Sequence, residues 1–105
     1  MSQEINDNNF LEILQNSSKP ILVDFWAPWC GPCRQLGPII DQLTQEMSEK
    51  ITIYKCNVDD NPEFPSKFFV RGIPALMIFK NNKLIDSKVG SLPKESLVDW
   101  IEQNI

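Results

Sequence analysis

Two cysteines separated by two residues, Cys30 and Cys33, are the side chains whose types and spacing most directly suggest chemistry. Cysteines at this spacing can close a small disulfide ring, and they lie where an apolar run ends and a helical pattern begins. The free amides and the positive dipole end at the start of a helix stabilise a thiolate. We therefore expect Cys30 to attack, and Cys33, one turn further along, to be more buried and to react second. Between them, Gly31 allows a close backbone turn and Pro32 fixes φ at the helix start.

Asp24 is the second candidate, because it is the one charged residue in the apolar run Ile21-Leu22-Val23-Asp24-Phe25-Trp26. A carboxylate in a strand that is apolar on both faces is desolvated, which raises its pKa. Such a group could accept a proton from a nearby thiol such as Cys33. The alternative is an ordinary Asp that faces solvent at the edge of a strand.

The composition excludes several other kinds of site. The chain has 105 residues, 10 basic and 14 acidic side chains, three cysteines and no histidine. Without histidine there is no imidazole base and no histidine-ligated metal, and three cysteines cannot form a four-thiolate site. We therefore expect no metal and no cofactor, which leaves a zinc knuckle or a chance pair as a poor alternative for the two cysteines. A net charge of -4 argues against binding nucleic acid.

The N-terminal residues Met-Ser-Gln-Glu-Ile contain no basic stretch followed by an apolar one, and the longest apolar run covers only residues 75–79. We expect neither a signal peptide nor a membrane span. An odd number of cysteines without a secretion signal is typical of a reducing compartment, so we expect a cytoplasmic protein.

Apolar periodicity predicts the elements that must position these side chains. Helices are expected over residues 8–16, behind the potential caps Asn6 and Asp7, over 33–47, over 62–68 and after Pro93. Strands are expected over 21–26, 51–58, 75–79 and 84–89, the last two joined as a hairpin by Asn81-Asn82. Pro38 should bend the long helix without ending it.

This order of elements predicts the fold class. Long crossovers join parallel strands and the hairpin adds antiparallel ones, so the sheet must be mixed, with helices on both faces. We expect an α/β protein, a three-layer α/β/α sandwich in which residues 1–105 form a single domain.

Several short motifs occur together in this chain. They are Val23-Asp24-Phe25-Trp26, Ala27-Pro28-Trp29-Cys30-Gly31-Pro32-Cys33, Pro38, Asp59, Asn61-Pro62 and Arg71-Gly72-Ile73-Pro74. In this order they resemble the thioredoxin family, and the resemblance covers nearly the whole chain. It implies the thioredoxin fold and a protein-disulfide reductase in which the Cys30 thiolate attacks a protein disulfide and Cys33 resolves the mixed disulfide.

The resemblance also implies roles and partners. Asp24 would accept the proton of Cys33, and Lys55 would face Asp24 and moderate its charge; an ordinary surface lysine is the alternative for Lys55. The partners would be disulfide-containing client proteins and a thioredoxin reductase that uses NADPH, with no nucleic acid and no membrane, and the protein would be a monomer.

A second part of the site is implied at Ile73-Pro74. Only about 5–6% of X-Pro bonds in folded proteins are cis, so the sequence alone favours trans, whereas the resemblance implies a cis bond beside the cysteines. The preceding backbone would then pair with an extended partner segment. The resemblance places these further residues along the groove: Trp29, Val58, Gly72, Val89, Gly90 and Ser91. For the apolar ones, core packing is the alternative.

Two residues stand outside this pattern. Cys56 has no partner at the same spacing, and we expect a small buried hydrophobe, with a regulatory thiol as the alternative. Phe69 stands where the family often has glycine or asparagine at positive φ, and because a bulky residue would be strained there, we expect the local backbone to adapt.

Two other functions compete with the reductase. An oxidant or isomerase is disfavoured by Gly31-Pro32, because many oxidising relatives have a histidine between the cysteines. A binding subunit without turnover is disfavoured because binding alone needs none of Cys30, Cys33 and Asp24.

Overall fold

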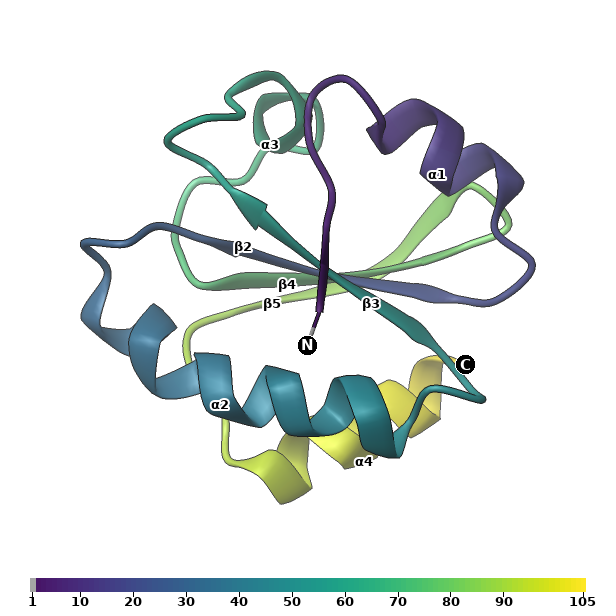
Figure 1. The fold of residues 1–105 in the computed structure, drawn as a ribbon. Helices are drawn as coiled ribbons and strands as arrows, with labels where there is room; N and C mark the ends of the chain where they lie inside the picture. Colours follow the sequence, from purple (N-terminus) through teal and green to yellow (C-terminus); the bar gives the residue numbers. More distant parts are fainter. Residues whose placement is uncertain (1) are drawn as a thin grey trace.

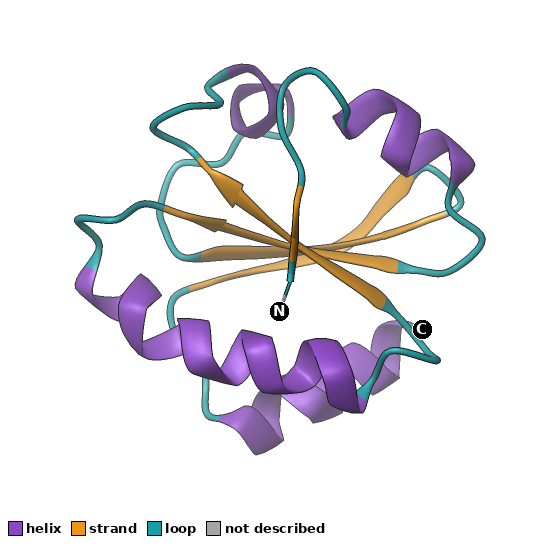
Figure 2. Cartoon of the chain, in the orientation of Figure 1, coloured by secondary structure: helices purple, strands orange, loops and turns teal. Residues whose placement is uncertain are grey.

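The structure is a computed structural model that describes residues 2–105. Its elements, in chain order, are β1 (Gln3–Glu4), α1 (Phe10–Asn16), β2 (Ile21–Trp26), α2 (Gly31–Glu46), β3 (Thr52–Asn57), α3 (Glu63–Lys67), β4 (Ala75–Lys80), β5 (Lys83–Val89) and α4 (Lys94–Asn104). The strands form one mixed sheet, with α1 and α3 on one face and α2 and α4 on the other (Figures 1 and 2). The predicted three-layer α/β/α sandwich is confirmed. None of the helices in residues 2–105 is long and apolar enough to cross a membrane.

β2 lies at the centre of the sheet, whose order is β1-β3-β2-β4-β5. It runs parallel to β3 and antiparallel to β4, and β4 and β5 form the predicted hairpin. Asn81 and Asn82 turn the hairpin with φ of 54° and 65°, a conformation that asparagine tolerates better than most residues.

The first strand was not predicted. β1 pairs with β3 in parallel, with Gln3 beside Tyr54 and Glu4 beside Lys55. Two residues are too few to show the alternation by which a strand is found in a sequence, so only the tertiary pairing reveals it.

Two hydrophobic cores fill the spaces between the sheet and its helices. In β2, Leu22 belongs to the core under α2 and α4, while Val23 and Phe25 belong to the core under α1 and α3. Because side chains alternate along a strand, Asp24 shares the face of Leu22 and lies beneath α2. The sheet therefore presents a carboxylate to the helix that carries the cysteines.

The two predicted caps of α1 have other partners. α1 begins at Phe10 rather than residue 8, because Oδ1 of Asn6 accepts hydrogen bonds from the N–H groups of Asn8 and Asn9 and closes a turn before the helix. Asp7 caps α3 instead. Its carboxylate accepts hydrogen bonds from the N–H groups of Glu63 at 3.0 Å and Phe64 at 2.8 Å. A residue more than fifty positions away thus satisfies the free amides at the start of α3.

We predict that Asp7→Ala lowers the free energy of unfolding by about 1–2 kcal/mol, because two amides at the start of α3 lose their acceptor. Urea unfolding of the wild type and the variant would measure the difference. Asp60→Ala is the control, since Asp60 is an exposed acidic residue in the loop before α3 and makes no side-chain hydrogen bond among residues 2–105. Equal losses in the two variants would contradict the capping role.

Candidate active site

The two cysteines lie at the start of α2, just beyond the end of β2. Cys30 is the N-cap of α2, a disulfide joins it to Cys33, and their Cα atoms are 5.2 Å apart. The N–H of Cys33 donates a hydrogen bond to Sγ of Cys30 at 3.2 Å. Sγ of Cys30 therefore already receives one of the free amides of the helix start, an arrangement that would stabilise a thiolate at Cys30 in the reduced protein.

The two cysteines are buried to nearly the same extent in this disulfide form. Cys30 is 5% exposed and Cys33 is 4% exposed. Their surroundings distinguish them instead, because Cys30 occupies the cap position and Cys33 lines a cavity that also contains Asp24.

Trp29 stands beside the disulfide with 67% of its surface exposed. Its indole N–H donates to the carboxylate of Asp59, 3.1 Å from each oxygen, which holds the exposed ring in place. The sequence predicts no such role for Asp59, since a carboxylate near a helix start is usually solvated.

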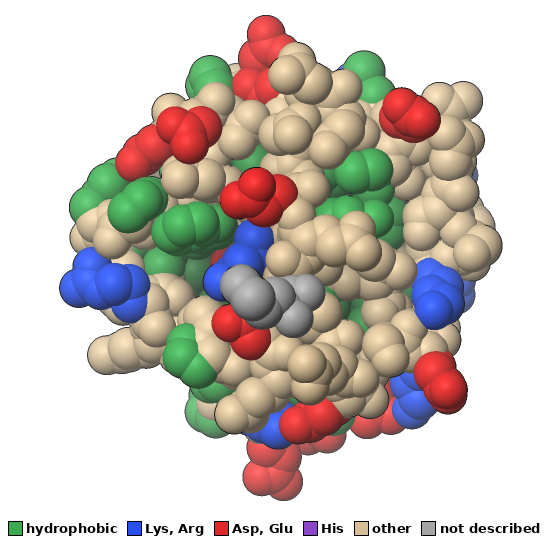
Figure 3. Space-filling view, in the orientation of Figure 1, with side chains coloured by type: hydrophobic (Ala, Val, Ile, Leu, Met, Phe, Trp, Pro, Cys, Tyr) green, Lys and Arg blue, Asp and Glu red, His purple; other side chains and the backbone are tan. Residues whose placement is uncertain are grey.

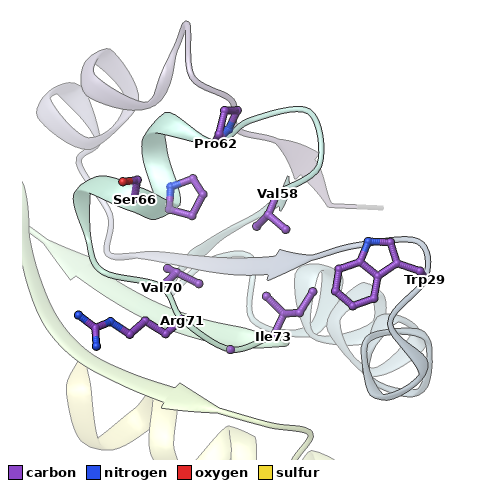
Figure 4. Close-up of a pocket in the computed structure, with 9 residues that line it drawn as sticks. Trp29, Val58, Pro62, Ser66, Val70, Arg71 and Ile73 are labelled. Carbon is purple, nitrogen blue, oxygen red and sulfur yellow. The ribbon is translucent and has the colours of Figure 1, made fainter.

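A groove of about 560 Å³ runs from Trp29 toward α3 (Figure 4). Trp29 lies at one end and Arg71 at the other, with Val58 and Ile73 between them. Four of the residues expected along a groove line it: Trp29, Val58, Gly72 and Ile73. In the view of Figure 3, hydrophobic side chains gather at the left of the molecule, where β2 passes into α2.

The other wall of the groove was not predicted. It is formed by Pro62, Pro65, Ser66, Val70 and Arg71. The short apolar pattern of α3 identified a helix, but nothing in that pattern says which of its sides faces the cysteines. The sequence signal for Arg71 was its place in the Arg71-Gly72-Ile73-Pro74 motif.

The Ile73–Pro74 bond is cis, as the resemblance implied. The N–H of Gly90 donates to the carbonyl of Pro74 at 2.8 Å, and a Cβ added at Gly72 would lie 3.2 Å from Cγ1 of Val89. The end of β5 therefore lies close to the residues on both sides of Ile73. Four residues expected along the groove are not among the described residues that line it: Pro74, which is buried, Val89 and Ser91, which are exposed, and Gly90.

Phe69 keeps a positive φ of 59° and is 77% exposed, so the expected adaptation of its backbone is wrong. Its N–H donates to the carbonyl of Ser66, and the N–H of Val70 donates to the carbonyl of Pro65. These two bonds form the turn that commonly ends a helix with a left-handed residue. Helix termination at α3 thus imposes the left-handed conformation on a residue whose side chain disfavours it.

A second cavity, of about 290 Å³, lies beneath the first turns of α2. Cys33, Gly37 and Asp41 reach it from one face of the helix, at intervals of four residues, and Asp24 and Lys55 reach it from the sheet. Trp26, Arg34 and Pro38 complete its lining. The structure therefore brings Asp24, Lys55 and Cys33 to one cavity, as expected. Asp41 was missed, although its spacing from Cys33 was visible in the sequence.

Asp24 is 1% exposed, and neither of its carboxylate oxygens has a hydrogen-bond partner within residues 2–105. Burial raises its pKa from the ordinary value of 3.8 to about 7, partly opposed by the positive charge of Lys55 and reinforced by the negative charge of Asp41. The predicted desolvation of Asp24 is confirmed. A carboxyl group with a pKa of about 7 can both accept and release protons near neutral pH.

Cys56 is fully buried in the core under α1 and α3 and has no disulfide partner among the described residues. Burial raises the pKa of its thiol to about 12, and the nearby Asp7 carboxylate adds to the effect. The expectation of a buried core residue is confirmed.

We predict that Asp24→Asn stabilises the disulfide form at pH 8 by up to about 4 kcal/mol, since a pKa difference of one corresponds to about 1.4 kcal/mol. The folded protein binds the Asp24 proton more tightly than the unfolded chain, so the wild type loses stability as pH rises from about 4 to about 7. The advantage of the variant should therefore shrink below pH 5. Urea unfolding at pH 4.5 and 8 measures it, with exposed Asp99→Asn as control. An advantage of equal size at both pH values would contradict the raised pKa.

Comparison with known proteins agrees with this geometry. The family model described as Thioredoxin matches residues 1–103. The chain is 47% identical to thioredoxin of Rickettsia bellii over the full length of both proteins. It is 48% identical to thioredoxin of Haemophilus influenzae, over 96% of this chain and 94% of that protein. It is 46% identical to the chloroplastic M-type thioredoxin of Pisum sativum, over 98% of this chain and 60% of that protein. With the Cys30–Cys33 disulfide at the start of α2, these matches show that the chain belongs to the thioredoxin family.

Proposed function

We propose that this protein reduces disulfides in other proteins. The observation that carries the proposal is the Cys30–Cys33 disulfide at the start of α2, beside an open apolar groove. Membership of the thioredoxin family supports thiol–disulfide exchange as the chemistry. The direction of that exchange, toward reduction of a partner, is our proposal.

The proposed reaction begins with the reduced protein. The Cys30 thiolate attacks one sulfur of a partner disulfide, a new S–S bond joins Cys30 to the partner, and the second partner sulfur leaves as a thiolate that takes up a proton. Cys33 then loses its proton and attacks Sγ of Cys30. The bond between Cys30 and the partner breaks, and the first partner sulfur leaves as a thiolate. The partner has then gained two electrons, and the protein that supplied them is left with the Cys30–Cys33 disulfide.

Asp24 is the proposed acceptor of the Cys33 proton. Both residues line the cavity beneath α2, and Asp24 has a pKa of about 7, between that of an ordinary carboxyl group and that of a thiol. A base with a pKa near the working pH can take the proton and later return it. Lys55 faces the same cavity and would moderate the charge that Asp24 carries.

The groove is the proposed site for an extended segment of the partner. Trp29, Val58, Gly72 and Ile73 line it. We propose further contacts, outside that lining, with Pro74, with Gly90, whose N–H donates to the carbonyl of Pro74, and with Val89 and Ser91. Apolar walls would take side chains of the partner, while backbone groups beside Pro74 would pair with its main chain. Nothing lies within 4 Å of a Cβ built at Gly31, so the space beside the residues between the two cysteines is open.

A thioredoxin reductase that draws electrons from NADPH is the proposed source of electrons for the next cycle. The site described above is formed within one chain, which supports action as a monomer. We also propose a cytoplasmic location, because a reductase works where its own cysteines are kept reduced.

We predict that Cys30→Ser abolishes reduction of a disulfide-containing test protein, whereas Cys33→Ser accumulates a mixed disulfide with it. The reason is that only Cys30 starts the exchange and only Cys33 can release the partner. Non-reducing electrophoresis and intact-mass analysis would detect the covalent complex. Cys56→Ala, at the buried third cysteine, is the control that should retain turnover. Equal activity of the two active-site variants would refute the scheme.

We also predict that the Cys30–Cys33 pair has a reduction potential more negative than that of the cytosolic glutathione pool. Gly31 and Pro32 supply no cationic side chain that would stabilise the reduced thiolate, so the disulfide form is comparatively favoured. Equilibration with glutathione buffers, read by thiol alkylation, gives the potential. A value well above that of the glutathione pool would instead identify an oxidant.

A further inference from the structure

Lys55 lies beside Asp24 in the sheet. The two residues are direct partners in the parallel pairing of β2 and β3, so their side chains emerge on the same face of the sheet. A direct ion pair between them would be the simplest arrangement. However, neither oxygen of Asp24 has a hydrogen-bond partner among residues 2–105, and Nζ of Lys55 lies 3.9 Å from Oδ1 of Asp41. The ammonium group is thus paired with the helix rather than with the buried carboxylate.

Other contacts define this position of Lys55. Its Nζ lies 5.6 Å from the centre of the Trp26 ring, within the range of a cation–π contact. It also lies 3.7 Å from the point where a Cβ at Gly37 would stand, which places the ammonium against α2. Asp41 follows Gly37 by one helical turn and is the acidic residue paired with Lys55 in the described chain.

We propose that Asp41 is a positioning residue, which holds Lys55 at the mouth of the cavity and thereby sets how readily Asp24 takes up a proton. The inference rests on the proposed function, in which that proton comes from Cys33. Two effects of Asp41 act in the same sense. Its negative charge disfavours a second negative charge at Asp24, and its pairing with Lys55 keeps the compensating ammonium away from Asp24.

The other charged groups around this site differ from Asp41 in their contacts. Arg34 also lines the cavity from α2, but its guanidinium donates to the carbonyl of Pro28 at 3.1 Å. Glu4 is the partner of Lys55 in the pairing of β1 with β3, and with Asp60 it lines a separate cavity on the other side of Lys55. Neither Glu4 nor Asp60 forms an ion pair with Lys55 in the part of the chain described. In the pairing of β2 with β4, the partner of Asp24 is the apolar residue Leu76. Glu4→Gln therefore removes a negative charge near Lys55 without removing its ion pair.

The first test is the titration of the Asp24 carboxyl group, followed by carbon NMR of the oxidised protein. In Asp41→Asn the midpoint should fall by about 0.5 pH units or more, the size expected for loss of a partly exposed ion pair. Asp41→Glu should restore it, and Glu4→Gln should leave it unchanged. An unchanged midpoint in Asp41→Asn, or an equal fall in Glu4→Gln, would overturn the inference.

A second test separates positioning from simple repulsion. In a Lys55→Gln background, Asp41 has no ammonium to hold, so Asp41→Asn should shift the midpoint by less than it does in the wild-type background. A shift of the same size in both backgrounds would show that Asp41 acts by its own charge alone and would overturn the positioning role.

A third test connects the titration with the reaction. Reduced protein is mixed with an aromatic disulfide. One coloured aryl thiolate is released when Cys30 attacks the disulfide, and the second is released when Cys33 attacks Sγ of Cys30 and breaks its bond to the remaining aryl sulfur. The pH profile of the second release should shift in Asp41→Asn by the same amount as the NMR midpoint. An NMR shift without a kinetic shift would support the control of Asp24 by Asp41 and would refute Asp24 as the base for Cys33. The two proposals therefore fail in different ways.

Discussion

The site depends on the position of β2, which is hydrogen-bonded on both sides and covered by helices on both faces. A strand in this position has no solvent-facing side, so the carboxyl group of Asp24 is buried wherever its side chain points. The same strand ends at Trp26, and a loop of a few residues carries the chain into α2 at Cys30. One element therefore fixes the place of the cysteines. It also holds the carboxyl group of Asp24, whose charged form is destabilised by burial, beneath the helix that bears them.

The disulfide lies between two cavities of different character. The groove beside Trp29 is open and mostly apolar, whereas the cavity beneath α2 contains Asp24, Lys55 and Asp41. Cys33 lines only the second of these. In the proposed reaction the partner would approach from the groove and the proton would leave on the other side. Binding of the partner and transfer of the proton would then depend on different residues.

Much of this arrangement could be predicted from the sequence because it follows from local patterns. The apolar run of β2 gave a central strand, the helical spacing after Cys33 gave α2, and the Asn81-Asn82 pair gave the hairpin. The burial of Asp24 followed from its neighbours in that run. The cis state of Pro74 came from the resemblance to a family and not from the residues themselves.

The features that could not be predicted are those in which distant segments meet. The cap that Asp7 provides for α3 joins residues more than fifty positions apart, and β1 is too short to have a period. The side of α3 that faces the groove is fixed by packing against the sheet. Phe69 shows a different limit, because its side chain predicts one backbone conformation and the hydrogen bonds that end α3 impose another.

The burial of Cys56 also bears on chemoselectivity. A protein that exchanges disulfides forms a bond between Cys30 and a foreign sulfur in every proposed cycle, and any other reactive thiol within reach could intercept that bond. Cys56 lies in the core on the opposite side of the sheet from Asp24, and its thiol stays protonated at any physiological pH. The chain can therefore keep a third cysteine as a core residue without a side reaction that forms incorrect disulfides.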